Sequence, residues 1–447
     1  MELAFLPAHR LAALVRQKKV GCLELLNLYL SRVDKHNAKL NAIIVLDAER
    51  ARKRARAADR ALAKGEVWGP LHGVPTTIKE SFDVEGLPTT WGRPELRDNI
   101  APRNALAVER LLQAGAVLFG KTNVPRLLAD WQTFNPIHGT TNNPWDVTRV
   151  PGGSSGGAAA ALAAGLTALE TGSDIGASIR NPAHYCGVFG HKPTFGVCSM
   201  EGQTLPPYTR QSDIDVIGPL ARSARDLEIA FKAIAGPDAD DAAGWQLRLP
   251  RAPDKTWRQW RVAALLDAPN AEVDRSVQDR LQTLAQFLAR QGAKVDDRAR
   301  PAIDLAEAHE VFIRLLRAAT TRALSDETFA LHQETARQLR PDDDSYYAWM
   351  VQANTMSHRD WLYLNEKRHR MRLKWAEFFR EYDLLLCPPA ATPAFPHNQQ
   401  GERWERMVIV NGKPQPSTTQ MFWAGYSGMC YLPSAVAPVG LTTGGCR

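Results

Sequence analysis

Two glycine- and serine-rich stretches contain the residues of this chain whose types and spacing could do chemistry. The first, GGSSGGAAA, covers residues 152–160, and the second, GSDIGASIRNPA, covers residues 172–183. In the second stretch, the small residues Gly176 and Ala177 leave backbone N–H groups free to face a ligand, directly before Ser178. Converging N–H donors beside a hydroxyl are what an oxyanion hole and a serine nucleophile require. A serine hydroxyl is a weak nucleophile, so this chemistry also needs a base.

Lys79 is the candidate base, because neither stretch contains a histidine. It ends an apolar, strand-like run, GVPTTIK, and this position favours partial burial. A lysine accepts a proton only when burial or nearby cationic charge keeps it neutral, and Ser–Lys pairs are a recognised variant of the serine triad. The nearest histidines, His184 and His191, lie in a segment whose pattern predicts packing and turns.

Two other interpretations of residues 152–157 lead to different chemistry. A phosphate-binding loop of the G-x-x-x-x-G-K-[ST] type needs a lysine that is absent here, and the dinucleotide fingerprint is absent as well. The pattern G-x-S-x-G is present and would make Ser155 the nucleophile of an α/β-hydrolase esterase. Such an elbow follows a strand directly, whereas Pro144 and Pro151 stand in the preceding segment. The residues alone leave Ser178 and Ser155 as rival nucleophiles.

The elements that must position these residues alternate between helix and strand patterns. This alternation predicts an α/β fold with helices on the faces of a sheet, in one large domain over residues 1–447. Residues 235–260 have the composition of a surface loop. Helices are expected at 21–35, 47–64, 104–114 and 272–291, with mostly helical segments at 303–339 and 357–381; strands are expected before Lys79, at 116–120, at 166–172, in RVAALLD and in YDLLLC.

Composition and charge exclude several other classes of protein. The 447 residues are 44% hydrophobic and 23% charged, which is typical of a globular domain. The longest apolar runs are shorter than the roughly 18–20 residues of a membrane span, and the N-terminus, with Glu2, lacks the pattern of a secretory signal. The six cysteines contain no C-x₂-C pair, which disfavours a zinc or redox site. We therefore expect a cytoplasmic location.

The basic run RARKRARAADR at residues 50–60 is the strongest sign of a nucleic-acid partner. Ala48, Ala51, Ala55 and Ala58 recur at helical spacing, and the basic residues fall mostly off that stripe. The net charge of +7 is also modest for this length. A solvated helix face is the better interpretation, so no nucleic-acid partner is expected.

Four motifs together resemble the amidase signature family of serine hydrolases. They are LHGVPTTIKESFDVEG, GKTNVPRLLADWQTFNPIHGTTNNPWD, PGGSSGGAAAALAAG and GSDIGASIRNPAHYCGVFGHKPTFG. The resemblance is dense over residues 70–220 and thinner over 20–65 and 383–440. It implies one large α/β domain in which helices cover both faces of a mixed, twisted central sheet, with a helical substrate-side region at about 300–380.

The resemblance also implies a Ser–cisSer–Lys triad. Lys79 matches the general base, Ser154 the bridging serine on a non-proline cis peptide, and Ser178 the nucleophile, 24 residues after Ser154. The expected reaction is hydrolysis of a small-molecule amide, with esterase activity as a side reaction, no metal or nucleotide cofactor, and a homodimer as a candidate assembly. The oxyanion-hole positions are Ile175, Gly176, Ala177 and Ser178, and the supporting polar positions are Ser155, Asp174 and Arg180.

This chain departs from the family pattern in two places. The family usually has glycine at the position of Ala177, where a positive φ would make the methyl group cost about 1 kcal/mol. After YLPSAVAPVG the family continues with a turn, a strand and a closing helix, whereas this chain ends in LTTGGCR. We therefore expect the usual C-terminal strand and helix to be missing. An inactive or partner-dependent amidase-like subunit is an alternative for this reason.

The resemblance leaves the substrate open, because family members act on fatty-acid, aryl, peptide and cyclic amides and on glutaminyl groups in amidotransferases. The segment LLADWQTFNP differs from the DEFAMG type of tRNA-dependent amidotransferase subunits, which argues against that role. Trp131 and Phe134 are candidates for an apolar substrate pocket, and a plain core position is an equally good interpretation of both.

Overall fold

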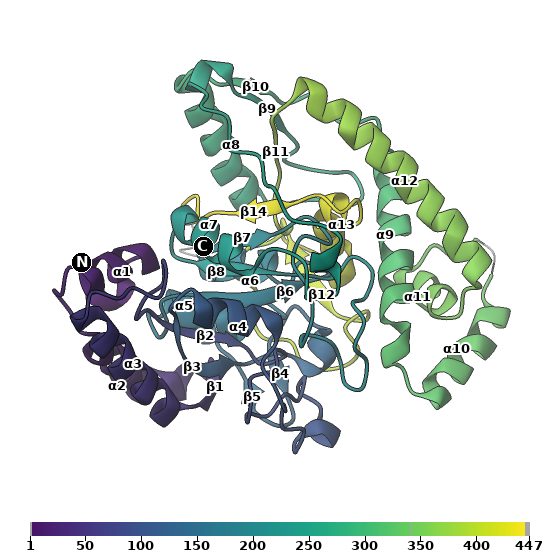
Figure 1. The fold of residues 1–447 in the computed structure, drawn as a ribbon. Coiled ribbons are helices and arrows are strands. Elements are labelled where there is room, and N and C mark those ends of the chain that lie inside the picture. Colours follow the sequence, from purple (N-terminus) through teal and green to yellow (C-terminus); the bar gives the residue numbers. More distant parts are fainter. Residues whose placement is uncertain (1, 341, 443–447) are drawn as a thin grey trace.

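The computed structural model describes residues 2–340 and 342–442 as a mixed α/β structure, which confirms the predicted fold class (Figure 1). One sheet is mixed: β3 (Val117–Thr122) pairs antiparallel with β1 (Ile43–Leu46) and parallel with β2 (Pro75–Lys79). All five residues of β2 are buried. Lys79 therefore ends a strand in the interior, as the apolar run before it predicts.

A second, antiparallel sheet carries the other half of the site. Its strand order is β14 (Ser434–Val436), β7 (Phe189–Lys192), β8 (Val216–Ala221) and β6 (Glu170–Asp174). Strands β2 and β6 lie side by side. The Thr77 hydroxyl donates to the Glu170 carboxylate, and Lys79 Nζ lies 2.9 Å from Ser173 Oγ. The structure thus has two neighbouring sheets where one central sheet is expected, and Lys79 and Asp174 end neighbouring strands.

The strand expected at 166–172 is displaced toward the C-terminus, because β6 begins only at Glu170. Gly165 has a φ of 65° after helix α5 (Gly156–Ala163), and Thr167 Oγ1 donates to the carbonyl of Leu169 at 3.2 Å. Residues 166–169 are consequently a turn, whose apolar side chains are buried without pairing in a sheet.

Three helices of the N-terminal half lie where the apolar stripes predict them, namely α2 (Cys22–Leu40), α3 (Ala48–Ala63) and α4 (Leu106–Gln113). The sequence patterns did not predict α1 (Ala8–Arg16) or α7 (Ala224–Ile234). In α3, Ala51, Ala55 and Ala58 are fully buried, whereas Arg50, Lys53 and Arg56 are exposed. The basic run is therefore a solvated face of an amphipathic helix. Helix α5 differs, because its residues from Gly156 to Leu162 are all buried, and it packs against strands of both sheets.

The C-terminal half adds a small parallel sheet and a layer of helices on the opposite side of the molecule from α1–α3 (Figure 1). The sheet joins β10 (Lys294–Asp296), β9 (Arg261–Ala264) and β11 (Leu384–Leu386), next to helix α8 (Arg275–Arg290). The helical layer consists of α9 (Leu305–Thr320), α10 (Asp326–Gln338), α11 (Tyr346–Asn354) and α12 (His358–Glu381). The sequence patterns did not predict α11, whose residues are mostly apolar.

Several short elements remain, among them helix α6 (Arg180–Cys186) just after Ser178. The hairpin of β12 (Met407–Val410) and β13 (Lys413–Pro416) precedes helix α13 (Met421–Gly428), and β4 (Phe134–Asn135) pairs with β5 (Gly139–Thr140). Within residues 2–340 and 342–442, no helix is both long and apolar enough to cross a bilayer. The departure from the family pattern at the C-terminus concerns the sequence after Gly440, and residues 443–447 of it lie outside the described residues.

Candidate active site

The loop at residues 152–155 passes so close to neighbouring backbone that two positions accept only glycine. Gly152 has a φ of 87°, and a Cβ atom there would lie 2.6 Å from Asn181 Oδ1. A Cβ atom at Gly153 would lie 2.2 Å from the carbonyl oxygen of Asp130. The peptide bond between Gly153 and Ser154 is cis. This path brings the Ser154 hydroxyl toward the end of β2.

Lys79 lies at the centre of a buried polar cluster. Its Nζ is 2.7 Å from Ser154 Oγ and 2.9 Å from Ser173 Oγ, and its side chain is fully buried. Gln203 extends the cluster, since its Nε2 donates to Ser173 Oγ at 3.2 Å. Burial lowers the pKa of Lys79, and the negative charges of Asp215, Asp174 and Glu170 only partly oppose this effect. Lys79 is thus suited to accept a proton, as the sequence predicts for the base.

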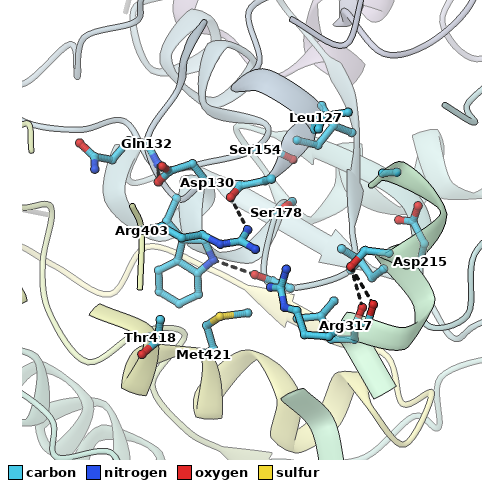
Figure 2. Close-up of a pocket in the computed structure, with 18 of the residues that line it drawn as sticks. Leu127, Asp130, Gln132, Ser154, Ser178, Asp215, Arg317, Arg403, Thr418 and Met421 are labelled. Atoms are coloured by element: carbon cyan, nitrogen blue, oxygen red, sulfur yellow. Dashed lines mark hydrogen bonds between the residues drawn. The ribbon is translucent and has the colours of Figure 1, made fainter. Parts of the chain in front are cut away.

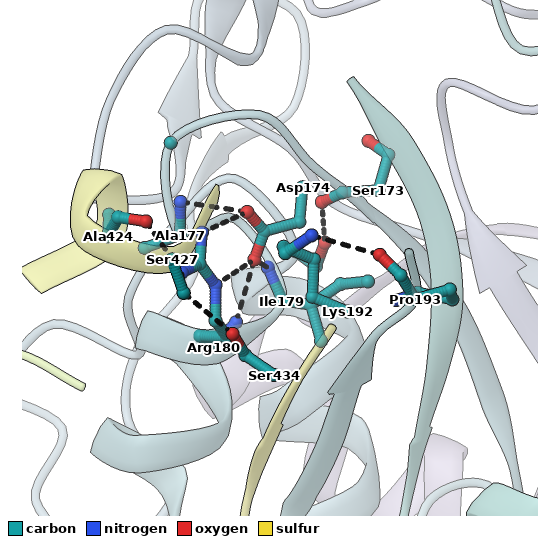
Figure 3. Close-up of polar contacts among 12 residues, drawn as sticks. Ser173, Asp174, Ala177, Ile179, Arg180, Lys192, Pro193, Ala424, Ser427 and Ser434 are labelled. Atoms are coloured by element: carbon teal, nitrogen blue, oxygen red, sulfur yellow. Dashed lines mark hydrogen bonds and ion pairs between the residues drawn. The ribbon is translucent and has the colours of Figure 1, made fainter. Parts of the chain in front are cut away.

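Asp174 shapes the loop that ends in Ser178 (Figure 3). Its carboxylate accepts hydrogen bonds from the N–H groups of Ala177 and Ile179, each at 3.0 Å. The guanidinium of Arg180 binds the same carboxylate with two donors, at 2.7 and 3.0 Å. Burial alone would raise the pKa of Asp174, but the charge and hydrogen bonds of Arg180 outweigh it and lower the pKa to about 2. Asp174 and Arg180 therefore form a buried ion pair behind the loop, and their supporting role stays a prediction.

The four expected oxyanion-hole positions are not equivalent. The N–H of Ala177 already donates to Asp174, so it is unavailable to a substrate, which corrects the expectation for that residue. Within the described chain, the N–H groups of Ile175, Gly176 and Ser178 donate no hydrogen bond, and these three residues line the same cavity. Ala177 has a φ of 79° and is fully buried, so its methyl group carries the conformational cost of about 1 kcal/mol anticipated from the sequence.

A cavity of about 270 Å³ brings the two serines together (Figure 2). Ser154 and Ser178 both line it and are 1% and 6% exposed. Their hydroxyls are not hydrogen-bonded to each other within the part of the chain that the structure describes, so a proton relay between them requires a side-chain rotation. The remaining walls are largely apolar and come from distant segments, namely Trp91, Leu127, Leu128, Trp131, Ile175, Leu205, Leu316, Phe395 and Met421.

The two aromatic candidates for the pocket, Trp131 and Phe134, lie in different surroundings. Trp131 lines the cavity, and its Nε1 donates to the carbonyl of Gly176 at 2.8 Å. Phe134 is absent from the lining of this cavity among the described residues. It lies instead in β4, where its ring packs 5.8 Å from the guanidinium carbon of Arg406.

Ser155, the rival nucleophile, points away from the cavity. It is fully buried at the start of α5, its hydroxyl donates to the carbonyl of Ser173 at 3.4 Å, and its N–H donates to the carbonyl of Ser178 at 3.0 Å. The segment before it is irregular rather than a strand. His184 and His191 are packed as expected, with burial lowering the pKa of each to about 4.

Asp215 and Ser173 belong to this site, although the sequence did not single them out. Asp215 precedes β8 and lines the cavity, and its removal from bulk water raises the pKa of its carboxyl while Lys79 opposes that rise. Ser173 stands beside Asp174 in β6. The available signal was their position at strand ends, because adjacent strands bring such ends together.

Comparisons with known proteins show which family this chain is similar to. The model of the Amidase family matches residues 24–445. An indoleacetamide hydrolase of Bradyrhizobium diazoefficiens is 32% identical over 443 residues, covering 97% of this chain and 80% of that protein. A glutamyl-tRNA(Gln) amidotransferase component of Desulforamulus reducens is 32% identical over 413 residues, covering 88% and 84%. A crystal structure of an amidase superposes with a TM-score of 0.78 at 28% identity, covering 99% of this chain and 94% of that one.

Proposed function

This chain belongs to the amidase family, and from that premise we propose that it hydrolyses a carbon–nitrogen amide bond of a small molecule through an acyl-enzyme on Ser178. The observation that carries the proposal is the fully buried Lys79, with its Nζ 2.7 Å from Ser154 Oγ, in a cavity wall that also holds Ser178. A base, a hydroxyl relay and a second hydroxyl beside free N–H groups are the parts that acyl transfer needs.

Acylation begins with neutral Lys79, which takes the hydroxyl proton of Ser154 as Ser154 takes the proton of Ser178. Ser178 Oγ then bonds to the amide carbon, and the N–H groups of Ile175, Gly176 and Ser178 hold the oxygen that becomes negative. The carbon–nitrogen bond breaks, and the proton on Lys79 returns through Ser154 to the leaving amine. The acyl group remains on Ser178 as an ester.

Deacylation uses the same groups with water in place of Ser178. Water attacks the ester carbon, its proton passes through Ser154 to Lys79, and the carboxylic acid leaves as Ser178 regains its proton. Burial supports the role of Lys79 in both acylation and deacylation. It lowers the pKa of the Lys79 amine and so increases the fraction of neutral amine near pH 7. The same acyl-enzyme accepts esters, so we expect an esterase side activity.

Turnover of an acyl 4-nitroanilide by purified variants tests the proposal. Ser178→Ala should lower kcat by roughly 10⁶-fold, as loss of a serine nucleophile does elsewhere. Ser155→Ala is the comparison variant and should lower turnover far less, because among the described residues that hydroxyl lies behind the cavity wall and donates to the carbonyl of Ser173. Loss of turnover in Ser155→Ala with full activity in Ser178→Ala would support the α/β-hydrolase alternative instead.

A partner-dependent subunit is the second candidate function. Its support is the similarity to amidotransferase subunits, which reaches 42% identity over 250 residues with that of Moorella thermoacetica, covering 56% of this chain and 50% of that protein. Robust amide hydrolysis by the purified chain alone would exclude it, whereas activity that appears only with added partner proteins would favour it. A single domain, a homodimer and a cytoplasmic location stay predictions.

A further inference from the structure

Four arginines line the cavity among the described residues, and two of them have a carboxylate close by. Arg406 donates to Asp130 at 2.6 Å. Arg322 lies over the ring of Tyr208 at 4.8 Å, and its charge acts on Asp215, whose carboxyl pKa burial raises and Lys79 and Arg322 lower. Arg406 is therefore paired with a carboxylate, and Arg322 lies within the electrostatic reach of one. The other two are Arg317 and Arg403.

Arg317, on α9, is a buried charge without a counter-ion in the described structure. Its side chain is 7% exposed, and its Nε has no hydrogen-bond partner among the described residues. Its guanidinium carbon lies over the ring of Tyr346, 5.6 Å from the ring centroid, in a cation–π contact. Burial and, to a smaller extent, the charge of Arg403 together lower the pKa of this guanidinium to about 10. An isolated buried charge is costly, so a ligand of opposite charge would gain from binding here.

Arg403 approaches the same space from the loop before β12. One of its terminal nitrogens donates to the carbonyl of Ala129 at 2.6 Å, whereas its buried Nε has no partner among the described residues. In Figure 2 the guanidinium groups of Arg317 and Arg403 extend toward one another beside Ser178. Two like charges are thus held close together in a cavity whose remaining walls are mostly apolar.

We propose that the substrate amide carries a carboxylate, which Arg317 and Arg403 bind together while Ser178 attacks the amide carbon. The planar guanidinium presents paired donors that match the two oxygens of a carboxylate. Trp131, Leu316 and Met421 line the space around these groups and suit an apolar linker between the carboxylate and the amide. This inference rests on the proposed function of Ser178, and it specifies the substrate class as monoamides of dicarboxylic acids.

The kinetic test compares glutaryl 4-nitroanilide with its methyl ester, which has the same chain without the negative charge. The wild type should favour the carboxylate by about 10- to 100-fold in kcat/KM, as expected for charge-assisted hydrogen bonds. Arg317→Met should abolish this preference, whereas release of 4-nitroaniline from the methyl ester should continue. Arg403→Gln provides an independent variant on a half-exposed loop. Arg314→Gln is the matched control, since Arg314 lies on α9 but pairs with Glu310 at 2.7 Å.

A binding test separates this inference from the proposed function. Glutaramate titrated into the Ser178→Ala variant should bind with saturation, and adding Arg317→Met should weaken binding about 10-fold or more. Ser178-dependent hydrolysis of the ester with no advantage for the carboxylate would overturn the inference and leave the proposed function standing. Arg317-dependent binding of glutaramate by a chain that hydrolyses neither compound would uphold the inference and refute the proposed function. Equal binding with and without Arg317 would also overturn the inference.

Discussion

Replacing Asp174 with asparagine tests whether one buried carboxylate holds the loop before Ser178 in place. The substitution keeps the volume but turns one acceptor oxygen into a donor. The new amide N–H₂ would point at other donors, namely the N–H groups of Ala177 and Ile179 or the guanidinium of Arg180. All three now donate to the carboxylate at 3.0 Å or less. Arg180 would remain buried beside β14 with its charge unbalanced.

Two independent estimates give the size of the effect. Breaking a buried ion pair by removing one partner costs about 3–5 kcal/mol. The pKa of Asp174, lowered from 3.8 to about 2, corresponds to about 2.5 kcal/mol of stability. Since the folded pKa is the lower one, this stability is present above pH 4 and is lost as the pH falls toward 2. We expect Asp174→Asn to lower the free energy of unfolding by about 2–5 kcal/mol.

Urea denaturation and amide turnover measure the two consequences separately. Turnover should fall by about 100-fold or more, because the oxyanion donors shift when the loop loses its anchor. Asp296→Asn is the matched control: Asp296 also accepts backbone N–H groups, from Arg298 at 2.8 Å, but it lies near the surface. Unchanged turnover together with a loss of stability no greater than that of the control would refute this account of Asp174.

Three further predictions concern other parts of the site. Lys79→Ala should abolish a rise of kcat/KM with pH, and that rise should occur below the ordinary lysine pKa of 10.5, because the folded site favours the neutral amine; a pH–rate profile unchanged by the substitution would exclude Lys79 as the base. Ala177→Gly should relieve about 1 kcal/mol of backbone strain, and since a buried methyl group contributes a similar amount, urea denaturation should show a net change near zero. Gly153→Ala should sharply lower the yield of folded protein or its thermal stability, because the new Cβ would lie 2.2 Å from the carbonyl of Asp130; wild-type stability in calorimetry would contradict the tight packing of this loop.

The local motifs were predictable from the sequence because each depends on residues close together in the chain. The alanine stripe of α3 and the burial of Lys79 at the end of an apolar strand follow directly from spacing and composition. The start of β6 did not follow, because a hydroxyl contact of Thr167 turns an apolar run that resembles a strand.

The walls of the cavity were beyond the reach of local patterns. Trp131 and Phe134 are three residues apart and both aromatic, yet only Trp131 faces the cavity, because the backbone hairpin of β4 and β5 places Phe134 against Arg406. Arg317 and Arg403 come from separate segments, and nothing in either segment distinguishes a buried arginine from a solvated one. The single methyl group of Ala177 stands out only because the resemblance supplies a glycine for comparison.

The position of a covalent adduct tests the central claim most directly. The purified chain is treated with a fluorophosphonate, which reacts with activated serines, and the modified peptide is sequenced by mass spectrometry. We predict one adduct, on Ser178, that is absent in the Ser178→Ala variant and much slower to form in Lys79→Ala. An adduct on Ser155, or labelling of Ser178 at an undiminished rate without Lys79, would contradict the proposed mechanism.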